Sequence, residues 1–277
     1  MADWICAYNS NGFAHHRLED ALRILAELGY GGVALTLDVH HLDPFADGHE
    51  RACRDLARLL EELQLDLVIE SGARFNLDPR RKHYPSLLCR RDGRRRLDYL
   101  LRCHDTALAL GASVVSLWSG HDFEEIGFAA AFDLLVENLG ELLDRCRSSG
   151  VAFAFEPEPG MLIETLEQYD RLAATLDRPG FGLALDLGHL LVTGEAEPED
   201  VLRARGADAL TIAIEDMRRG RHEHLPFGEG DLDLDAVIGA LDDCGYSGLV
   251  AVELSRSSSD AVRIAAESLH ELAVRRG

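Results

Sequence analysis

The stretch LGASVVSL, residues 110–117, joins the end of a predicted helix to a glycine and then to a short apolar strand. The same order recurs in LGYGGVAL (28–35), SGVAFAF (149–155) and CGYSGLVAV (244–252). Glycine suits a helix end because it adopts the left-handed conformation without steric cost. Apolar runs with little alternation are typical of parallel strands that are covered on both faces. The pattern therefore predicts a parallel sheet made of repeated strand–helix units.

This unit can be followed along the whole chain. Amphipathic stretches such as 18–28 alternate with short apolar runs that we predict to be strands. Eight units close a barrel, whereas a doubly wound sheet more often has five or six strands. A barrel needs about 250 residues, so we predict that residues 1–277 form a single (β/α)8 TIM-barrel domain. The predicted strands are 4–8, 32–37, 65–70, 113–118, 151–156, 182–186, 209–214 and 249–254.

Composition bears on which partners and which cellular compartment can be expected for the protein. The formal net charge is -21, whereas proteins that bind nucleic acid through phosphates carry a basic surface, so a nucleic-acid partner is not expected. No apolar run reaches the roughly 18–20 residues that cross a bilayer, and residues 1–11 lack the pattern of a signal peptide. The six cysteines form no CxxC pair. We therefore expect a cytoplasmic protein with reduced cysteines that are structural.

Acidic and histidine side chains follow the predicted strands at their carboxyl ends, where barrels build their active sites. A buried carboxylate is costly unless it is paired, hydrogen-bonded or bound to a metal. Several carboxylates in one mouth would repel each other, and a divalent cation removes that repulsion. The sequence therefore predicts a divalent-metal site, the alternative being a rim of helix-capping and ion-paired carboxylates. The residues concerned are Glu70, Glu156, Glu158, Asp186, His189, Glu215, Asp216, His222, His224 and Glu253.

The order and strand placement of these motifs resemble the sugar phosphate isomerase/epimerase superfamily, the xylose isomerase-like or AP endonuclease family 2 TIM barrels. The resemblance covers nearly the whole chain. It is carried by the EP at 156–157, the DxxH at 186–189, the HxH before GEG at 222–230, and Glu253.

The resemblance implies a ligand set for one metal ion. In ketose 3-epimerases of this superfamily the ligands are Glu, Asp, His and Glu from strands five to eight, and Glu156, Asp186 and Glu253 match three of them. The histidine of the HxxD motif falls on Ala213. The fourth ligand is open between His224, His222 and Glu215, which is predicted to share a face with Ala213.

The expected cofactor is one divalent cation, Mn²⁺, Mg²⁺, Co²⁺ or Zn²⁺, with a second, histidine-rich metal position as the alternative. The DNA-repair members of the superfamily bind three zinc ions. Trp118 stands where they have a zinc-binding histidine, so a trinuclear site is not expected.

Several residues are predicted to bind substrate rather than metal. Arg74 opens a basic segment that could hold an anionic group, with a solvated charge run as the alternative. Trp118 is predicted to form an apolar wall, with core packing as the alternative. His222 and His224 are alternatively substrate contacts or structural. The predicted substrate-binding residues are Asn9, with its neighbour Asn11, and Arg74, Trp118, Glu158, His189 and Glu215.

The resemblance implies a metal-dependent isomerase or epimerase that acts on a sugar or related polyhydroxy carbonyl compound through an enediolate. Glu156 and Glu253 are the predicted catalytic residues, one removing a proton and the other returning it. The alternatives are a metal-dependent dehydratase or hydrolase, and a catalytically degenerate binding barrel. By analogy with the family, we expect a homo-oligomer.

Overall fold

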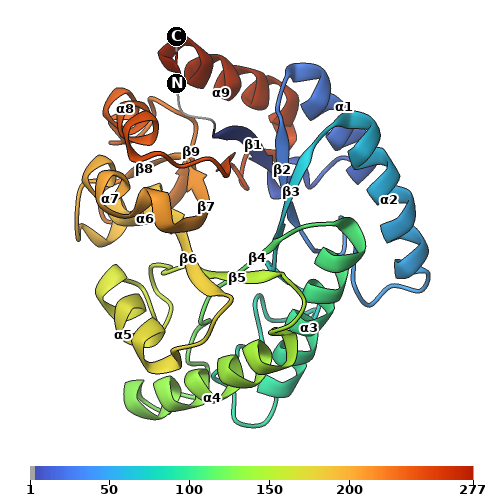
Figure 1. The fold of residues 1–277 in the computed structure, drawn as a ribbon, viewed down its shortest axis with the longest axis vertical. Coiled ribbons are helices and arrows are strands. Elements are labelled where there is room, and N and C mark those ends of the chain that lie inside the picture. The colour runs from blue at the N-terminus through green and yellow to red at the C-terminus, as the bar shows by residue number, and fades with distance from the viewer. Residues whose placement is uncertain (1–3, 277) are drawn as a thin grey trace.

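The computed structural model describes residues 4–276, and its strands form one closed parallel barrel, which confirms the predicted (β/α)8 TIM-barrel fold (Figure 1). Around the barrel the order is β1-β10-β7-β6-β5-β4-β3-β2, so strands that follow each other in this series are neighbours in the ring. The strands are β1 (Ile5–Asn9), β2 (Gly32–Thr36), β3 (Asp66–Glu70), β4 (Val114–Leu117), β5 (Ala152–Phe155), β6 (Phe181–Asp186), β7 (Ala209–Ile214) and β10 (Leu249–Val252).

The helices lie outside the ring of strands and bury their apolar faces against it (Figure 1). In α1 (Leu18–Leu28), the residues Leu18, Leu22 and Leu25 are buried at helical spacing, and the helix ends at Gly29 with a left-handed φ of 106°. No helix within residues 4–276 has the length and apolarity to cross a membrane. The other outer helices are α2 (His49–Leu63), α3 (Gly93–Leu110), α4 (Phe128–Cys146), α5 (Leu166–Leu176), α7 (Pro198–Arg205), α8 (Leu234–Cys244) and α9 (Ala261–Arg276).

Two features of the fold were not predicted. A short helix, α6 (Leu187–Thr193), begins directly after β6, because the Asp186 side chain accepts a hydrogen bond of 3.0 Å from the His189 backbone N–H. After β7 the chain forms an antiparallel hairpin of β8 (Asp216–Arg218) and β9 (Arg221–Leu225). Short 3₁₀ helices, η1 (Ser10–Phe13), η2 (Gly206–Asp208) and η3 (Ser258–Asp260), complete the connections.

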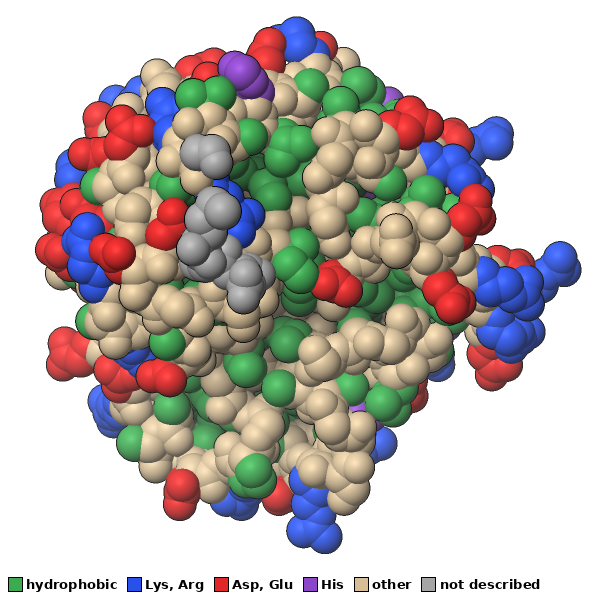
Figure 2. Space-filling view, turned by 45° about the horizontal axis from the view of Figure 1, so that its top comes forward, with side chains coloured by type: hydrophobic (Ala, Val, Ile, Leu, Met, Phe, Trp, Pro, Cys, Tyr) green, Lys and Arg blue, Asp and Glu red, His purple; other side chains and the backbone are tan. Residues whose placement is uncertain are grey.

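The surface carries charges of both signs. Acidic and basic side chains lie side by side around the outline of the face in Figure 2, and many are paired, such as Arg205 with Asp170 at 2.8 Å. Such exposed pairs each contribute little to stability. The six cysteines are all free thiols.

Small side chains fill the interior of the barrel below its carboxyl end. Ala154, Ala184 and Ala251 are buried there, on β5, β6 and β10. Side chains alternate along a strand, so the residue two positions later points to the same interior. Those residues are Glu156, Asp186 and Glu253. Alternation of side chains therefore turns three separate strand ends into one acidic layer.

Candidate metal and substrate site

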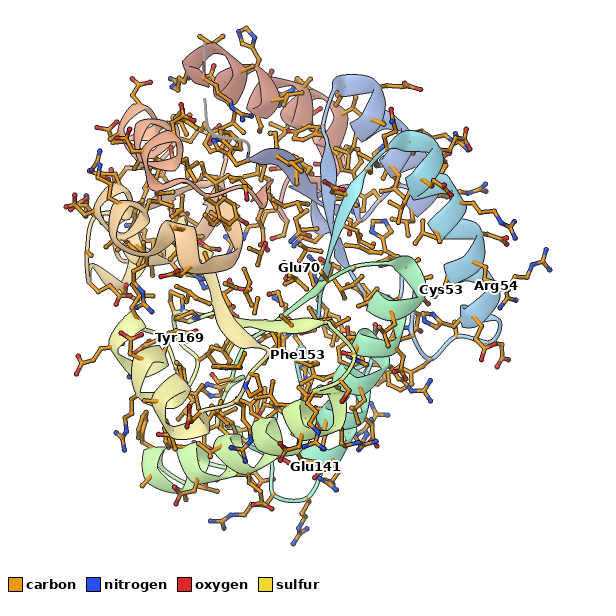
Figure 3. All side chains as sticks on the ribbon, in the orientation of Figure 1. Cys53, Arg54, Glu70, Glu141, Phe153 and Tyr169 are labelled. Carbon is orange, nitrogen blue, oxygen red and sulfur yellow. The ribbon has the colours of Figure 1, made fainter. Side chains whose placement is uncertain are left out.

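A cavity of about 310 Å³ opens at the carboxyl ends of the strands, above the acidic layer. Glu70 lies within the ring of strands in Figure 3, at the end of β3. Asp186 is only 3% exposed and lines a small adjoining pocket, which shares Glu70, Glu156 and Glu253 with the cavity. The cavity is lined by Asn9, Asn11, Thr36, Glu70, Gly72, Arg74, Lys82, His83, Trp118, Glu156, Glu158, Pro159, Met161, His189, His222, His224, Glu253, Ser255 and Arg256.

Nearly all of the sequence-predicted site residues therefore lie at this one cavity. Three predicted residues differ, because they are buried and absent from the lining: Asp186, Glu215 and Asp216. The lining also includes Thr36, Met161, Ser255 and Arg256, which sequence reasoning missed. They are ordinary residues of three different segments, at the end of β2 and after β5 and β10, and no local pattern distinguishes them before the barrel closes.

Three potential metal ligands converge at the floor of the cavity. Ligand atoms of Glu156, Asp186 and His189 all lie within 4.8 Å of one another. Nδ1 of His189 is 3.3 Å from Oε1 of Glu156, and its Nε2 is 3.5 Å from Oδ2 of Asp186. The sequence suggested His189 as a substrate contact, but α6 brings its ring into the group of potential ligands.

The electrostatics of the acidic layer favour a bound cation. Burial, followed by the charge of Asp186, raises the pKa of Glu156 well above its usual value. Burial and the charge of Glu253 raise the pKa of Glu70 and of Glu158 to about 8. The buried Oδ2 of Asp186 has no hydrogen-bond partner among the described residues. A divalent cation would satisfy this oxygen and remove the repulsion, so the residues fit such an ion.

The β8–β9 hairpin adds two histidines to the wall of the cavity. Nε2 of His222 lies 3.2 Å from Nε2 of His189. Burial and the charge of His224 lower the pKa of His189 to about 3, and burial together with His189 lowers that of His222 to about 4. Both imidazoles are therefore neutral at pH 7, the form that binds a metal ion.

Glu215 lies outside the cavity lining, next to the hairpin and close to Asp186, and its predicted role as a substrate contact stays a prediction. Its Oε1 lies 3.7 Å from Nδ1 of His224, and a Cβ at Gly188 would collide with it. Both carboxylate oxygens of Glu215 lack hydrogen-bond partners within residues 4–276, and burial raises its pKa well above the usual value. The chain turns into β8 after Ile214, so alternation along β7 does not bring this carboxylate to the cavity.

Asp216 organises the segment that follows the hairpin. It is 1% exposed, and its carboxylate accepts hydrogen bonds of 2.8–2.9 Å from the backbone N–H groups of Gly228, Gly230 and Leu232. The GEG loop at 228–230 thus wraps around a carboxylate of the same chain. Two of the N–H groups that could bind a phosphate are already used.

Replacing Asp216 by alanine is expected to lower the free energy of unfolding by about 3 kcal/mol or more, because three backbone N–H groups lose a charged acceptor. Urea denaturation at pH 7 measures this loss. Asp231 is the matched control, since it is exposed and accepts one backbone bond, from Arg219. Asp231→Ala should cost less than about 1 kcal/mol. An equally small loss for Asp216→Ala would contradict the role given to this carboxylate.

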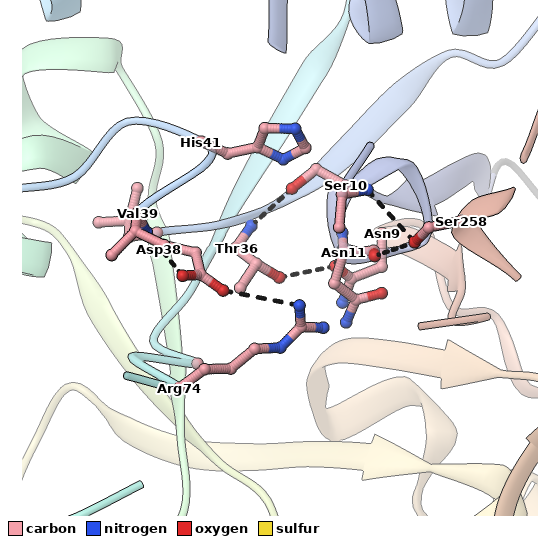
Figure 4. A network of polar contacts seen from close by, with 12 residues as sticks. Asn9, Ser10, Asn11, Thr36, Asp38, Val39, His41, Arg74 and Ser258 are labelled. Atoms are coloured by element: carbon pink, nitrogen blue, oxygen red, sulfur yellow. Dashed lines mark hydrogen bonds and ion pairs between the residues drawn. The ribbon is translucent and has the colours of Figure 1, made fainter. Parts of the chain in front are cut away.

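A network of polar contacts forms the opposite wall (Figure 4). The Asn9 side-chain oxygen accepts hydrogen bonds from Thr36 Oγ1 at 2.7 Å and from the Asn11 backbone at 3.0 Å. Asn11 donates in turn to Oε1 of Glu253 at 2.9 Å. Arg74 lies 3.6 Å from the buried Asp38, so its charge is partly balanced within the chain. These contacts fix the orientation of Glu253.

Curated proteins with related sequences match part of this chain. An inosose dehydratase of Geobacillus thermodenitrificans is 29% identical over 146 residues, which are 47% of this chain and 49% of that protein. An inosose isomerase of Bacillus licheniformis is 32% identical over 152 residues, 50% of this chain and 54% of that protein. The chain thus spans about half the length of these curated relatives.

Solved structures match over almost the whole length. A structure described as IOLI protein with a binding zinc atom superposes with a TM-score of 0.77 at 21% identity, covering 98% of both chains. An L-ribulose 3-epimerase gives a TM-score of 0.77 at 17% identity, covering 99% of this chain and 94% of that one. At these identities the likeness concerns the fold.

The family itself is established by a match along most of the sequence. The family model described as a xylose isomerase-like TIM barrel matches residues 22–273, which include every strand except β1 and every strand-end carboxylate described above. The chain belongs to the xylose isomerase-like TIM barrel family.

Proposed function

We propose that this protein is a divalent-metal-dependent isomerase or epimerase that acts on a sugar or a related polyhydroxy carbonyl compound. The observation that carries the proposal is the presence of Glu156, Glu253 and His189 in one cavity, with the buried Asp186 within ligand distance of Glu156 and His189. Around the barrel, β6 and β7 separate β5 from β10. The two carboxylates therefore reach a substrate from nearly opposite sides, as an exchange of protons between its two faces requires.

The cation would be held by Glu156, Asp186 and His189, joined by Glu253 and by His224 or His222 of the hairpin. This set of carboxylate oxygens and imidazole nitrogens suits Mn²⁺, Co²⁺ or Zn²⁺ better than Mg²⁺, which prefers oxygen ligands alone. When bound, the ion would polarise the substrate carbonyl and stabilise the negative charge of the enediolate.

The residues of this chain then move the protons. Asn11 fixes one oxygen of Glu253, which leaves the other to accept the proton from the carbon next to the carbonyl. The electron pair of the broken C–H bond forms the enediolate. Glu156 returns a proton from the other side, which inverts the carbon, or to the adjacent carbon, which moves the carbonyl. Trp118 and Met161 give the cavity an apolar wall, which suits the C–H faces of a sugar ring or chain.

The names of the relatives support a polyhydroxy ketone as substrate class, since they act on inosose or carry the names of sugar epimerases. They also favour a second candidate, a dehydratase. Loss of water from a β-hydroxy ketone begins with the same proton abstraction and differs only in the fate of the enediolate.

Product analysis in deuterated water separates the two candidates. The metal-loaded protein is incubated with inosose, D-allulose, D-tagatose and L-ribulose, and products are followed by NMR. We expect an isomer or epimer of one of these compounds, with one deuterium on the carbon next to the carbonyl. A product that has lost water would establish the dehydratase instead, and an unchanged set of compounds with no deuterium uptake would contradict both.

A further inference from the structure

His83 lies on the cavity wall, in the long segment between β3 and α3. Its Nδ1 is 2.9 Å from the carbonyl oxygen of Gly72. A carbonyl only accepts hydrogen bonds, so Nδ1 carries the proton and Nε2 carries the lone pair. Within residues 4–276, no hydrogen-bond partner reaches Nε2. The ring therefore offers the cavity an acceptor that has no partner in the protein.

Contacts with Trp118 and Arg96 hold the His83 ring in place, although the backbone of this residue is strained. His83 has a φ of +62°, a left-handed conformation that is uncommon for a residue other than glycine. Its ring packs edge-on against Trp118, with centroids 5.2 Å apart. The backbone is fixed by Arg96 of α3, which donates to the carbonyl oxygens of His83 at 2.9 Å and Pro85 at 3.0 Å. Strain of this kind persists where the surrounding structure imposes it, and it concentrates at functional sites.

Arg96 is itself unusual, because it is only 6% exposed and forms no ion pair with any described carboxylate. A buried guanidinium without a counter-charge is costly, and here its hydrogen bonds go to the backbone that carries His83. Burial, followed by the positive charges of Lys82 and Arg96, lowers the pKa of His83 to about 3. The ring thus stays neutral across the physiological range.

We propose that His83 is a substrate-binding residue whose Nε2 accepts a hydrogen bond from a hydroxyl group of the polyhydroxy substrate. A neutral ring nitrogen with a lone pair needs a donor, and a carboxylate or phosphate oxygen cannot supply one. An ammonium group would be repelled by Lys82 and Arg74. A hydroxyl is the donor that this environment accepts. The inference rests on the proposed function and extends it by assigning a hydroxyl-binding position on the segment between β3 and α3.

The test compares two conservative variants. His83→Asn keeps a donor for the Gly72 carbonyl and tolerates the left-handed backbone, but it has no acceptor at the place of Nε2. His83→Gln places an amide oxygen near that position. His121→Asn is the matched control, because Nδ1 of His121 also contacts a glycine carbonyl, that of Gly160 at 3.4 Å, on an exposed loop outside the cavity lining.

We expect kcat/KM of His83→Asn to fall about three- to tenfold, mainly through KM. His83→Gln should recover part of the loss, and His121→Asn should match the wild type. The assay uses whichever of inosose, D-allulose, D-tagatose or L-ribulose is turned over, together with its monodeoxy analogues. For the analogue that lacks the hydroxyl bound by His83, the wild type and His83→Asn should have equal kcat/KM.

Two outcomes overturn the assignment while the proposed function stands: wild-type kcat/KM in His83→Asn, or an equal loss with every deoxy analogue, which would indicate a structural role. If no compound is turned over, the affinity of myo-inositol for the metal-loaded proteins is measured by calorimetry. Weaker binding to His83→Asn than to the wild type then supports the hydroxyl contact although the proposed reaction fails. Equal binding, or no binding to the wild type, overturns it.

Discussion

Replacing Glu156 or Glu253 by glutamine is expected to lower kcat by about 100-fold or more, because each variant loses a group that accepts or returns a proton. Glutamine has nearly the same size, and it can still accept the hydrogen bond that Asn11 donates to Glu253. Burying a neutral amide costs less than burying a carboxylate. We therefore expect the free energy of unfolding of the metal-free variants to equal or exceed that of the wild type.

Exchange with solvent distinguishes the two carboxylates. Each variant, assayed with excess metal, should still exchange the substrate hydrogen that faces its remaining carboxylate, and it should fail to invert the carbon. Metal affinity should fall further in Glu156→Gln, since Glu156 belongs to the ligand group with Asp186 and His189. The control is Glu229→Gln, an exposed carboxylate of the GEG loop, which should leave kcat unchanged. Wild-type rates in both Glu156→Gln and Glu253→Gln would rule out the mechanism.

Removing the metal is expected to have the second large effect, a loss of activity of 100-fold or more that one equivalent of divalent cation restores. Binding should release protons. In the metal-free protein the pKa values of Glu70 and Glu158 are raised to about 8, so these carboxyls hold protons at pH 7 that a bound cation displaces. Calorimetry in buffers of different ionisation enthalpy measures the number released. The apparent affinity should rise with pH up to about 8.

The same carboxyls give the metal-free protein a characteristic stability profile. Between a normal carboxyl pKa of 4.5 and about 8, the folded protein holds protons that the unfolded chain has lost, so stability falls as pH rises. His83, His189 and His222 act in the opposite direction, but only below their normal pKa of 6.5. Between pH 6.5 and 8, the change of stability with pH is therefore due to the carboxyls.

We expect Tm of the metal-free protein to fall by several degrees across this window, at about 2–4 °C for each kcal/mol lost. The metal-loaded protein should show a much smaller fall, because its carboxylates are already ionised. Glu70→Gln removes one titrating group and should reduce the slope. A flat Tm in the metal-free wild type between pH 6.5 and 8 would contradict the assignment of these raised pKa values.

The barrel could be predicted from the sequence because the apolar runs and helix ends that indicate it are local patterns. The run 209–214 was predicted as a strand and is β7 with the same bounds, and the run 4–8 is β1 shifted by one residue. By contrast, α6 depends on a cap from Asp186, and the hairpin depends on pairing of Asp216 with Leu225. Neither leaves a hydrophobic periodicity, because both are short and line a polar cavity.

The position of Glu215 depends on the path of the chain after β7. Alternation along β7 would direct this carboxylate to the face of Ala213, but the chain changes direction after Ile214, and the side chain is buried behind His224. The role proposed for His83 is visible only in the structure. In the sequence His83 is one residue of a basic run, and its neutral, oriented ring results from Arg96 and Gly72, residues that flank it along the chain at a distance.

The barrel and its acidic layer can be predicted from the order of residues along the chain. Both follow from short-range rules. Because side chains alternate along a strand, Glu156, Asp186 and Glu253 point into the barrel like the alanines two positions before them. Which imidazoles reach that layer depends on contacts between segments that are far apart in the chain. The positions of His189, His222 and His83 depend on a helix cap, a hairpin and a buried arginine, and such contacts form only after the chain has closed around them.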